Sequence, residues 1–219
     1  MTYGLAERFV SINGEGARAG QLAVFLRFPG CNLRCGYCDT AWANENACPT
    51  ESLTLQEILD YVAGQRVSCV TVTGGEPLLQ RGMLPLLEGL SSLPGISVEV
   101  ETNGSVPLEG FQVPRVSMTM DYKLPDSGME GEMHLPNLDS LRAVDTLKFV
   151  CSSRRDMLRG KDLLEAHPNL EQVPTFFSPV FGWIEPSEMV AFLQEFQLKH
   201  VRLQLQLHKI IWSPDEKGV

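Results

Sequence analysis

Segments with the hydrophobic pattern of strands alternate along this chain with segments that have the hydrophobic spacing of helices. This order predicts its secondary structure. Short runs that are β-branched, or that alternate apolar with polar residues, have the pattern of strands. These runs cover residues 6–12, 21–28, 69–73, 96–101, 116–122, 146–150, 175–180 and 201–207. Segments with the apolar spacing of helices lie at 53–62, 79–90, 154–165 and 186–196. The first of these helices is expected to begin with a capping box, in which Thr54 is the N-cap and Glu57 closes the box.

Strands that alternate with helices indicate βα units arranged around a parallel sheet. About six units are too few to close an eight-stranded barrel, so we expect an α/β fold: an open, partial TIM-like βα barrel of about six parallel strands. In such barrels the ligand site lies at the carboxyl ends of the strands. The polar residues at or near these ends are Gly75, Glu76, Glu101, Thr102, Asn103, Asp121, Tyr122, Lys123, Lys148, Ser178 and His208. Their shared position predicts a single active site.

The composition narrows the class of protein. The chain of 219 residues suits one domain spanning residues 1–219, and 43% hydrophobic with 21% charged residues is ordinary for a soluble globular protein. The net charge of −9 argues against nucleic acid as a partner, because phosphate binding needs clustered lysines and arginines. The chain has neither a long uncharged apolar stretch nor a basic-then-apolar start. We therefore expect no membrane span, no secretion and a cytoplasmic location.

One loop, at residues 31–40, carries the strongest chemical signal. It holds Cys31, Cys35 and Cys38, three of the six cysteines, in the spacing C-x3-C-x2-C. Clustering of this kind indicates a metal centre in a reducing compartment rather than a disulfide framework. Three thiolates on a tight loop can bind three corners of a cubane iron–sulfur cluster or three positions on a zinc ion.

The number of ligands separates these two kinds of metal site. A structural zinc ion would need a fourth ligand, and usually a second pair of cysteines or histidines at short spacing. The four histidines and the other cysteines, Cys48, Cys69 and Cys151, stand alone in the sequence. Three ligands therefore favour a 4Fe-4S cluster with one iron open to a substrate or cofactor. A zinc knuckle, or three incidental cysteines, is the alternative that the spacing leaves open.

The pattern C-x3-C-x-aromatic-C, with Tyr37 before Cys38, resembles that of the radical S-adenosylmethionine (SAM) enzymes. The resemblance implies that Tyr37 lies over the adenine of SAM. It also implies that the segment Gly74-Gly75-Glu76-Pro77, which follows the strand at 69–73, binds the ammonium end of SAM. Two glycines directly after a strand let backbone groups approach a ligand without interference from a Cβ atom. A plain strand-to-helix turn is the alternative for this segment.

Four segments are similar to one branch of that superfamily, the 7-carboxy-7-deazaguanine synthases. They are FVSINGEG at 9–16, FLRFPGCNL at 25–33, CDT at 38–40 and TGGEP at 73–77, while MTMDYK at 118–123 and QLQLHK at 204–209 resemble the clostridial-type subgroup. Members of this family convert 6-carboxy-5,6,7,8-tetrahydropterin to 7-carboxy-7-deazaguanine with loss of ammonia, and they need SAM, the cluster and Mg2+. The resemblance implies that Cys31, Cys35 and Cys38 hold three irons while SAM chelates the fourth. A radical derived from SAM then removes hydrogen from C6 of the pterin, and SAM is regenerated.

The resemblance also implies roles for residues outside the cysteine loop. Arg27 is expected to bind the substrate carboxylate, because its planar fork suits a carboxylate; a surface salt bridge is the alternative. Glu15 is expected to accept hydrogen bonds from the pterin, although Gly14-Glu15-Gly16 also has the form of a hairpin turn. Gly75 is expected to contact the substrate as well as SAM. Thr40 corresponds to the magnesium-binding threonine of the family, with the substrate carboxylate and waters completing the ion.

Other contacts are expected at the carboxyl ends of the strands and in the tail. One or more of Glu101, Thr102, Asn103, Asp121, Lys123 and Gln206 should contact SAM. His208 either faces the substrate or has a structural role, and the tail after Trp212 is expected to close the site and present the Val219 carboxylate to the pterin. The expected partners are a one-electron reductant such as flavodoxin or ferredoxin and a second copy in a homodimer. The competing functions are another radical SAM reaction, such as activation of a glycyl-radical enzyme, and a non-catalytic metal-binding module.

Overall fold

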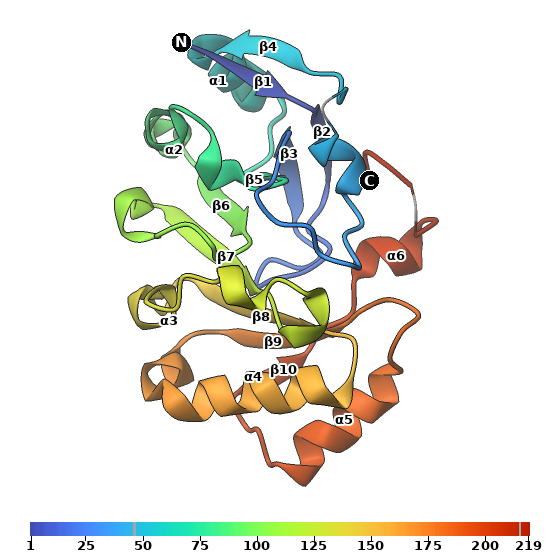
Figure 1. Cartoon of the computed structure of the whole chain (residues 1–219). Helices are drawn as coiled ribbons and strands as arrows, with labels where there is room; N and C mark the ends of the chain where they lie inside the picture. The colour runs from blue at the N-terminus through green and yellow to red at the C-terminus, as the bar shows by residue number, and fades with distance from the viewer. Residues whose placement is uncertain (46, 215) are drawn as a thin grey trace.

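An eight-stranded sheet runs through the computed structural model, which describes residues 1–45, 47–214 and 216–219 (Figure 1). The strand order is β10-β9-β8-β7-β6-β5-β3-β2. The strands are β2 (Glu7–Ile12), β3 (Leu22–Phe28), β5 (Cys69–Gly74), β6 (Ser97–Thr102), β7 (Val116–Tyr122), β8 (Thr146–Cys151), β9 (Thr175–Pro179) and β10 (Val201–Leu203). Seven strands, β3 and β5 to β10, are parallel, and β2 pairs antiparallel with β3. The predicted α/β fold with an open, partial barrel is confirmed, with seven parallel strands where about six were expected.

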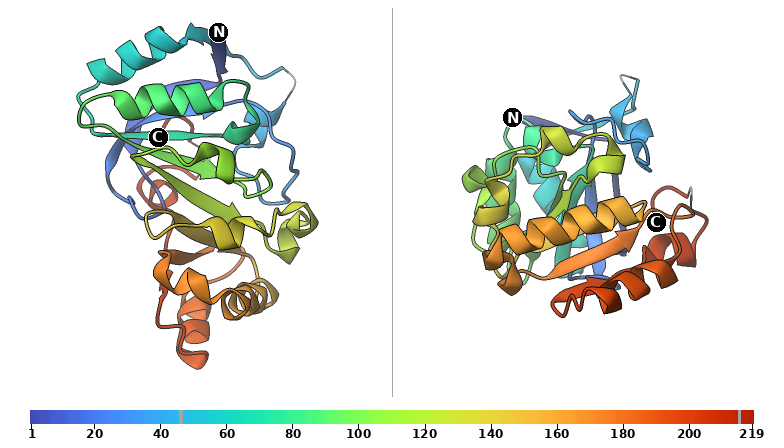
Figure 2. Two further views of the ribbon diagram at one scale, coloured as in Figure 1. Left: turned by 90° about the vertical axis from the view of Figure 1, so that its left-hand side faces the viewer. Right: turned by 60° about the horizontal axis from the view of Figure 1, so that its bottom comes forward.

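Helices follow the strands as the alternating pattern predicted. They are α1 (Leu55–Gly64), α2 (Met83–Ser92), α3 (Asn137–Ser140), α4 (Arg154–Ala166), α5 (Pro186–Glu195) and α6 (Leu207–Ile211). Helix α2 packs against β6, α4 against β8, and α5 against β9 and β10. Figure 2 shows the longer helices succeeding one another in chain order along the molecule. Within the described residues, no helix is both long enough and apolar enough to cross a bilayer.

The capping box at the start of α1 forms as predicted. The Thr54 hydroxyl accepts from the Glu57 N–H at 3.3 Å, and the Glu57 carboxylate accepts from the Thr54 N–H at 2.7 Å. The predicted helix began two residues too early, because Leu53 belongs to a strand, β4 (Glu51–Thr54), and is buried. This strand pairs with β1 (Thr2–Leu5) in a small separate sheet that the sequence did not predict.

Two other elements begin or end away from their predicted positions. Helix α2 starts at Met83 rather than at 79, because Pro77–Leu79 form a 3-10 turn and Gly82 has a positive φ of 82°. Strand β10 ends at Leu203 rather than at 207. The residues that follow it leave the sheet and bond to the loop between β2 and β3, and α6 then begins at Leu207.

Candidate active site

The carboxyl ends of the strands surround a cavity of about 430 Å³. The cysteine loop, the strand ends and the segment after β10 all contribute to its wall. The predicted site residues that line it are Glu15, Arg27, Cys31, Cys35, Tyr37, Cys38, Thr40, Gly74, Gly75, Glu101, Thr102, Asn103, Asp121, Lys123, Gln206, His208 and Val219. The structure therefore brings most of the predicted residues to one site, whereas Glu76, Tyr122 and Ser178, which were also expected there, do not line the cavity.

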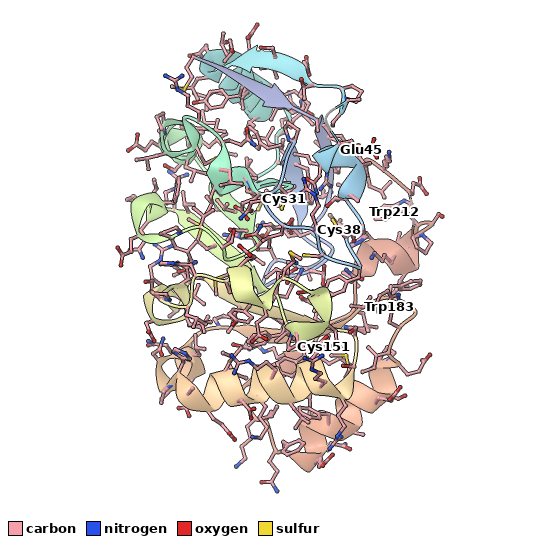
Figure 3. The ribbon with its side chains drawn as sticks, in the orientation of Figure 1. Cys31, Cys38, Glu45, Cys151, Trp183 and Trp212 are labelled. Atoms are coloured by element: carbon pink, nitrogen blue, oxygen red, sulfur yellow. The ribbon has the colours of Figure 1, made fainter. Side chains whose placement is uncertain are left out.

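The three cysteines of the loop are free thiols, half-buried along the cavity. Figure 3 shows Cys31 and Cys38 near the middle of the molecule, away from its outer helices. The Cys31 sulfur accepts from the Leu33 N–H at 3.3 Å and from the Asn103 side-chain amide at 3.4 Å. Donors of this kind stabilise sulfur that carries negative charge, as a metal-bound thiolate does. Burial raises the pKa of the Cys35 thiol, although Lys123 nearby acts in the opposite direction.

The donor set fits a cubane cluster better than a single ion. Across residues 1–45, 47–214 and 216–219, no three His, Cys, Asp or Glu side chains gather closely enough to hold one metal ion. Thiolates that bind a cubane attach to three different irons, so they lie farther apart than thiolates around one zinc ion. Three free thiols that share one loop and one cavity meet the requirement of a 4Fe-4S cluster. Thr40, the expected magnesium ligand, has its hydroxyl 3.8 Å from the Cys38 sulfur.

The segment after β5 is held against the entrance of the cysteine loop. The Gly75 N–H donates to the Phe28 carbonyl at 3.0 Å, and the Glu76 N–H donates to the Gly30 carbonyl at 2.8 Å. A Cβ atom on Gly75 would collide with the Gly30 carbonyl and with the side chain of Asn44. Glycine is thus required here for close packing of two chain segments, while Gly74 and Gly75 still face the cavity.

Glu76, which was expected to contact SAM, does not line the cavity. Its side chain is fully buried outside the cavity lining. The carboxylate accepts from the Thr102 hydroxyl at 3.0 Å, from the Asn103 N–H at 2.6 Å and from the Leu78 N–H at 3.0 Å. These bonds join the end of β5 to the end of β6, so Glu76 fixes the shape of the wall. The pattern in the sequence gave its position but not the direction of its side chain.

Largely buried charged side chains form a connected cluster in the cavity wall. Lys148 Nζ lies 3.0 Å from a Glu15 oxygen and 3.7 Å from an Asp121 oxygen, and Lys123 Nζ lies 2.9 Å from the same Asp121 oxygen. Burial alone would raise the pKa of Glu15, but Lys148, and then Gln206, outweigh it and lower that pKa. Burial lowers the pKa of both lysines, and the neighbouring carboxylates outweigh it and raise that pKa. Glu15 and the two lysines therefore stay ionised at neutral pH.

Lys148 was noted at a strand end but given no role by the sequence. The signal that could have found it is a lysine inside β8, a strand whose six residues are all buried. A charged residue in such a strand needs a partner or a ligand. Asn44 was missed altogether, because nothing in its surroundings distinguishes it from an ordinary loop residue.

Four buried oxygens of the cavity wall have no hydrogen-bond partner among the described residues. They belong to the side chains of Glu15, Asn44, Asp121 and Gln206. Each of these atoms is a carboxylate or amide oxygen, which can only accept at neutral pH. Because an unpartnered buried acceptor costs free energy, the wall is complementary to a ligand that brings N–H or O–H donors.

Arg27 forms a cross-strand pair with Glu7 inside the cavity. Its Nε donates to Glu7 Oε2 at 2.9 Å, and the two residues are in register on β3 and β2. The arginine side chain is only 15% exposed, so the alternative of a surface salt bridge identified the kind of partner but not the location. Its terminal nitrogens have no protein acceptor within the described part of the chain. This leaves the charged fork available to an anionic ligand.

The Gly14-Glu15-Gly16 turn joins β2 to β3, so it is both a hairpin turn and part of the site. The Asn13 N–H donates to the Gln21 carbonyl at 2.9 Å, as expected at the base of a hairpin loop. Gly16 has a φ of 78°. A Cβ atom on Gly14 would collide with the imidazole of His208, which also lines the cavity. His208 thus combines the two roles that the sequence left open, packing on the turn and facing the ligand space.

The tail covers part of the same cavity. Pro214 and the described residues 216–219 line it, and Lys217 Nζ lies 4.3 Å from the centre of the Trp42 ring. Lys209 of α6 pairs with Asp39 of the cysteine loop at 3.0 Å. One contact therefore connects the chain after β10 to the cysteine loop, and the other connects it to Trp42, just after that loop.

Comparison with known proteins agrees with this geometry. A model of the radical SAM superfamily matches residues 25–115. A 7-carboxy-7-deazaguanine synthase from Clostridium acetobutylicum is 49% identical over 100% of both chains, and one from Chlorobaculum tepidum is 38% identical over 98% of this chain and 96% of its own. Among solved structures, QueE from Escherichia coli has a TM-score of 0.77 at 22% identity, over 94% of each chain, so it shares the fold. Full-length identity at this level shows that the chain belongs to the 7-carboxy-7-deazaguanine synthase family of the radical SAM superfamily.

Proposed function

We propose that this chain converts 6-carboxy-5,6,7,8-tetrahydropterin to 7-carboxy-7-deazaguanine with loss of ammonia, in the biosynthesis of queuosine and related deazapurines. The observation that carries the proposal is the composition of one cavity wall. Three free thiols on one loop face the same space as the Arg27 fork and several unpartnered acceptor oxygens. Membership of the family adds the identity of the reaction.

The wall has the polarity that the pterin requires. The substrate carries amino and ring N–H donors and one carboxylate. The free oxygen of Glu15 matches a donor on the ring, because the other oxygen of that carboxylate is already held by Lys148 and Gln206. Arg27 supplies the cation for the substrate carboxylate. Glu15 stays ionised in this arrangement, so it acts as an acceptor throughout.

The cysteine side of the cavity would hold the cofactors. Cys31, Cys35 and Cys38 would bind a 4Fe-4S cluster, and Gly74, Gly75 and Asn103, which line the same cavity, would bind SAM. When bound, the cluster and SAM supply the one-electron chemistry that removes a hydrogen atom from the substrate. The chain orients the two ligands toward each other and excludes water. Tyr37 contributes an aromatic surface, with its hydroxyl donating to the Val150 carbonyl at 3.3 Å.

Several finer assignments form part of the proposal. Thr40 would bind Mg2+ together with the substrate carboxylate and waters, because magnesium usually keeps several waters. Glu101, Asp121, Lys123 and Gln206 would contribute polar contacts to SAM, while His208 and Val219 would contact the pterin. A one-electron reductant such as flavodoxin or ferredoxin, a homodimer and a cytoplasmic location complete the proposal.

Anaerobic turnover tests the proposed function directly. The protein is reconstituted with iron and sulfide, then given SAM, dithionite, Mg2+ and 6-carboxytetrahydropterin, and products are followed by mass spectrometry. The native protein should form the ring-contracted product, and the Cys35→Ala variant should not. Slow cleavage of SAM without a deazapurine would retain the cluster assignment and refute the substrate. A colourless protein that cleaves no SAM would instead support a zinc site in the cysteine loop.

A further inference from the structure

The two edge strands of the sheet do not pair with each other, but backbone and side-chain hydrogen bonds join the segments that follow them. Strands β2 and β10 lie at opposite ends of the strand order. The chain that follows β10 nevertheless returns to the turn that follows β2, and in Figure 1 the segment leading to α6 passes beside the first loops of the chain. The Leu207 N–H donates to the Gly14 carbonyl at 3.1 Å, and the Gln206 amide donates to Glu15 at 3.2 Å. The barrel is thereby closed at the point where Glu15 enters the cavity.

Gln204 makes the most specific contact in this closure. Its side-chain oxygen accepts from the Gly16 N–H at 2.7 Å, and its NH2 group donates to the Gly16 carbonyl at 2.9 Å. The side chain is 9% exposed, and Gly16 is buried. Both polar groups of Gly16 are thus satisfied by one residue that lies 188 positions away. A primary amide is suited to this contact because it carries a donor and an acceptor side by side.

The contact fixes the residue that precedes Gly16. Glu15 lies between Gly14, whose carbonyl is held by Leu207, and Gly16, whose N–H and C=O are held by Gln204. One oxygen of the Glu15 carboxylate is bound by Lys148 and Gln206, and the other is buried without a hydrogen-bond partner among the described residues, in a side chain that lines the cavity. Ala17, Ala19 and Gly20, farther along the same loop, are exposed. Without the contact from Gln204, the Gly16 N–H would lose its partner, and the Gly16 carbonyl would keep only the bond from the Ala19 N–H, at 3.3 Å, in this exposed part of the loop, among the described residues.

We propose that Gln204 is a positioning residue for substrate binding, which acts by holding the Gly16 peptide so that the free oxygen of Glu15 meets the donors of the ligand. The proposal rests on the proposed function, because it assigns the pterin as the ligand of Glu15. Gln204 itself does not line the cavity, so its effect on the substrate must pass through the turn. It is therefore distinguishable from residues that touch the substrate directly.

The test compares Gln204→Met with the native chain. Methionine keeps the length and volume of glutamine but removes both hydrogen bonds to Gly16. The dissociation constant of 6-carboxytetrahydropterin is measured anaerobically by calorimetry on the cluster-reconstituted, SAM-loaded enzyme without reductant. We expect it to rise by about tenfold, as loss of one or two buried hydrogen bonds at a positioned acceptor implies. The dissociation constant of SAM should stay within about twofold, because no hydrogen bond of Gly16 within the described residues reaches the cysteine loop.

A double-mutant cycle separates positioning from general loosening of the fold. In a Glu15→Gln background, Lys148 and Gln206 keep the one remaining side-chain oxygen, and an NH2 group replaces the free oxygen that Gln204 positions. Gln204→Met should therefore raise the pterin dissociation constant by less than about a further twofold. The matched control is Leu164→Ala, a buried change on α4, outside the cavity lining. It should lower the melting temperature and leave the pterin dissociation constant unchanged. Should Gln204→Met fail to fold, Gln204→Glu, which keeps the acceptor for the Gly16 N–H but not the donor, is judged by the same criteria.

Each outcome decides the proposal. Equal pterin affinity in the native and Gln204→Met proteins overturns it, as does an equal effect with and without Glu15. If the native protein binds no pterin, the proposed function fails, and Gln204 is judged by hydrogen exchange of the peptide covering residues 13–17. Faster exchange there in Gln204→Met, and not in Leu164→Ala, supports the positioning of the turn. Unchanged exchange refutes it.

Discussion

The loop that carries the three cysteines and the wall that carries Glu15 face the same cavity, but they are assembled from very different distances along the chain. Cys31, Cys35 and Cys38 lie within eight residues of one another. Glu15 depends on Lys148 and Gln206, which are 133 and 191 residues away. A local loop can hold its ligands whatever the rest of the barrel does, whereas the Glu15 wall exists only when the first and last thirds of the chain meet. Substitutions in the cysteine loop should therefore impair metal binding alone, whereas substitutions at several distant positions should each impair the wall that carries Glu15.

The largest effect is expected from substitutions in the cysteine loop. Replacing any one of Cys31, Cys35 or Cys38 with Ala removes a ligand that no neighbouring residue can supply, so iron content should collapse and turnover should fall by at least about a thousandfold. Iron and sulfide analysis after reconstitution measures this. The matched control is Cys151→Ala, because Cys151 is buried outside the loop and, among the described residues, its thiol donates to the Phe149 carbonyl, at 3.7 Å. Full iron content in a loop variant, or loss of iron in the control, would contradict the assignment.

The same contrast decides what could be predicted from the sequence. The cysteine loop, the capping box at Thr54 and the strand at Val116–Tyr122 were predictable, because spacing and neighbouring residues determine them. The pairing of β1 with β4 was not, since its two short strands are about fifty residues apart and neither alternates clearly.

Side-chain direction was the other gap between sequence and structure. Glu76 and Gly75 are adjacent in one motif, yet Gly75 faces the cavity and Glu76 is buried beneath it. The end of β10 was misplaced for a related reason. Gln204 and Gln206 continue an alternating pattern but bond to the turn at 14–16 instead of to a strand. A periodic pattern predicts which residues share a face of an element. The contacts of that face depend on how the whole barrel packs.

Arg27 offers the next largest effect and tests the wall built from β2 and β3. Arg27→Lys should lower kcat/KM by about a hundredfold, mainly through KM, because an ammonium cannot keep the bond to Glu7 and also present a planar fork to a carboxylate. Steady-state kinetics on the pterin measures it. Arg8→Lys on the neighbouring strand is the control, since Arg8 pairs with Glu51 at a more exposed position and should leave kinetics unchanged. Equal kinetics in the two variants would mean that Arg27 is structural.

Lys148 connects Glu15 to Asp121, so its replacement should alter the pH dependence. In the native protein the pKa of Glu15 lies below its ordinary value of 4.5, because Lys148 and Gln206 outweigh burial. A lowered carboxyl pKa adds stability above that ordinary value, and the gain disappears as pH falls through the folded-state pKa. In Lys148→Met, burial dominates and the pKa of Glu15 rises. Pterin binding should then weaken at a higher pH than in the native protein, and stability at pH 7 should fall by about 3 kcal/mol.

Pterin affinity and urea unfolding between pH 4 and pH 8 measure these two effects of Lys148→Met. The charged groups around Glu15 include Lys148, Asp121 and His208, so His208→Gln serves as the control for the other titrating neighbour. An acid limb that stays in place in Lys148→Met, or that moves in His208→Gln alone, would assign the pH dependence elsewhere. Lys148→Arg keeps the charge and should retain most of the native profile.

The smallest effect on substrate binding should come from substitutions in the tail that follows α6. Lys217 lies over the Trp42 ring, and an exposed cation–π contact contributes about 0.5–1 kcal/mol, or roughly a two- to fivefold change. Lys217→Met should raise KM for the pterin by that factor and leave the dissociation constant of SAM unchanged; Lys199→Met, an exposed change away from the cavity, should alter neither. A much larger rise in KM would mean that Lys217 touches the substrate, and no rise would mean that the tail packs without this contact. Trp42 follows the cysteine loop, and Lys217 follows α6. The expected small rise in KM would therefore show that closure of the cavity by the tail couples the cysteine loop only weakly to the side of the cavity that carries Glu15.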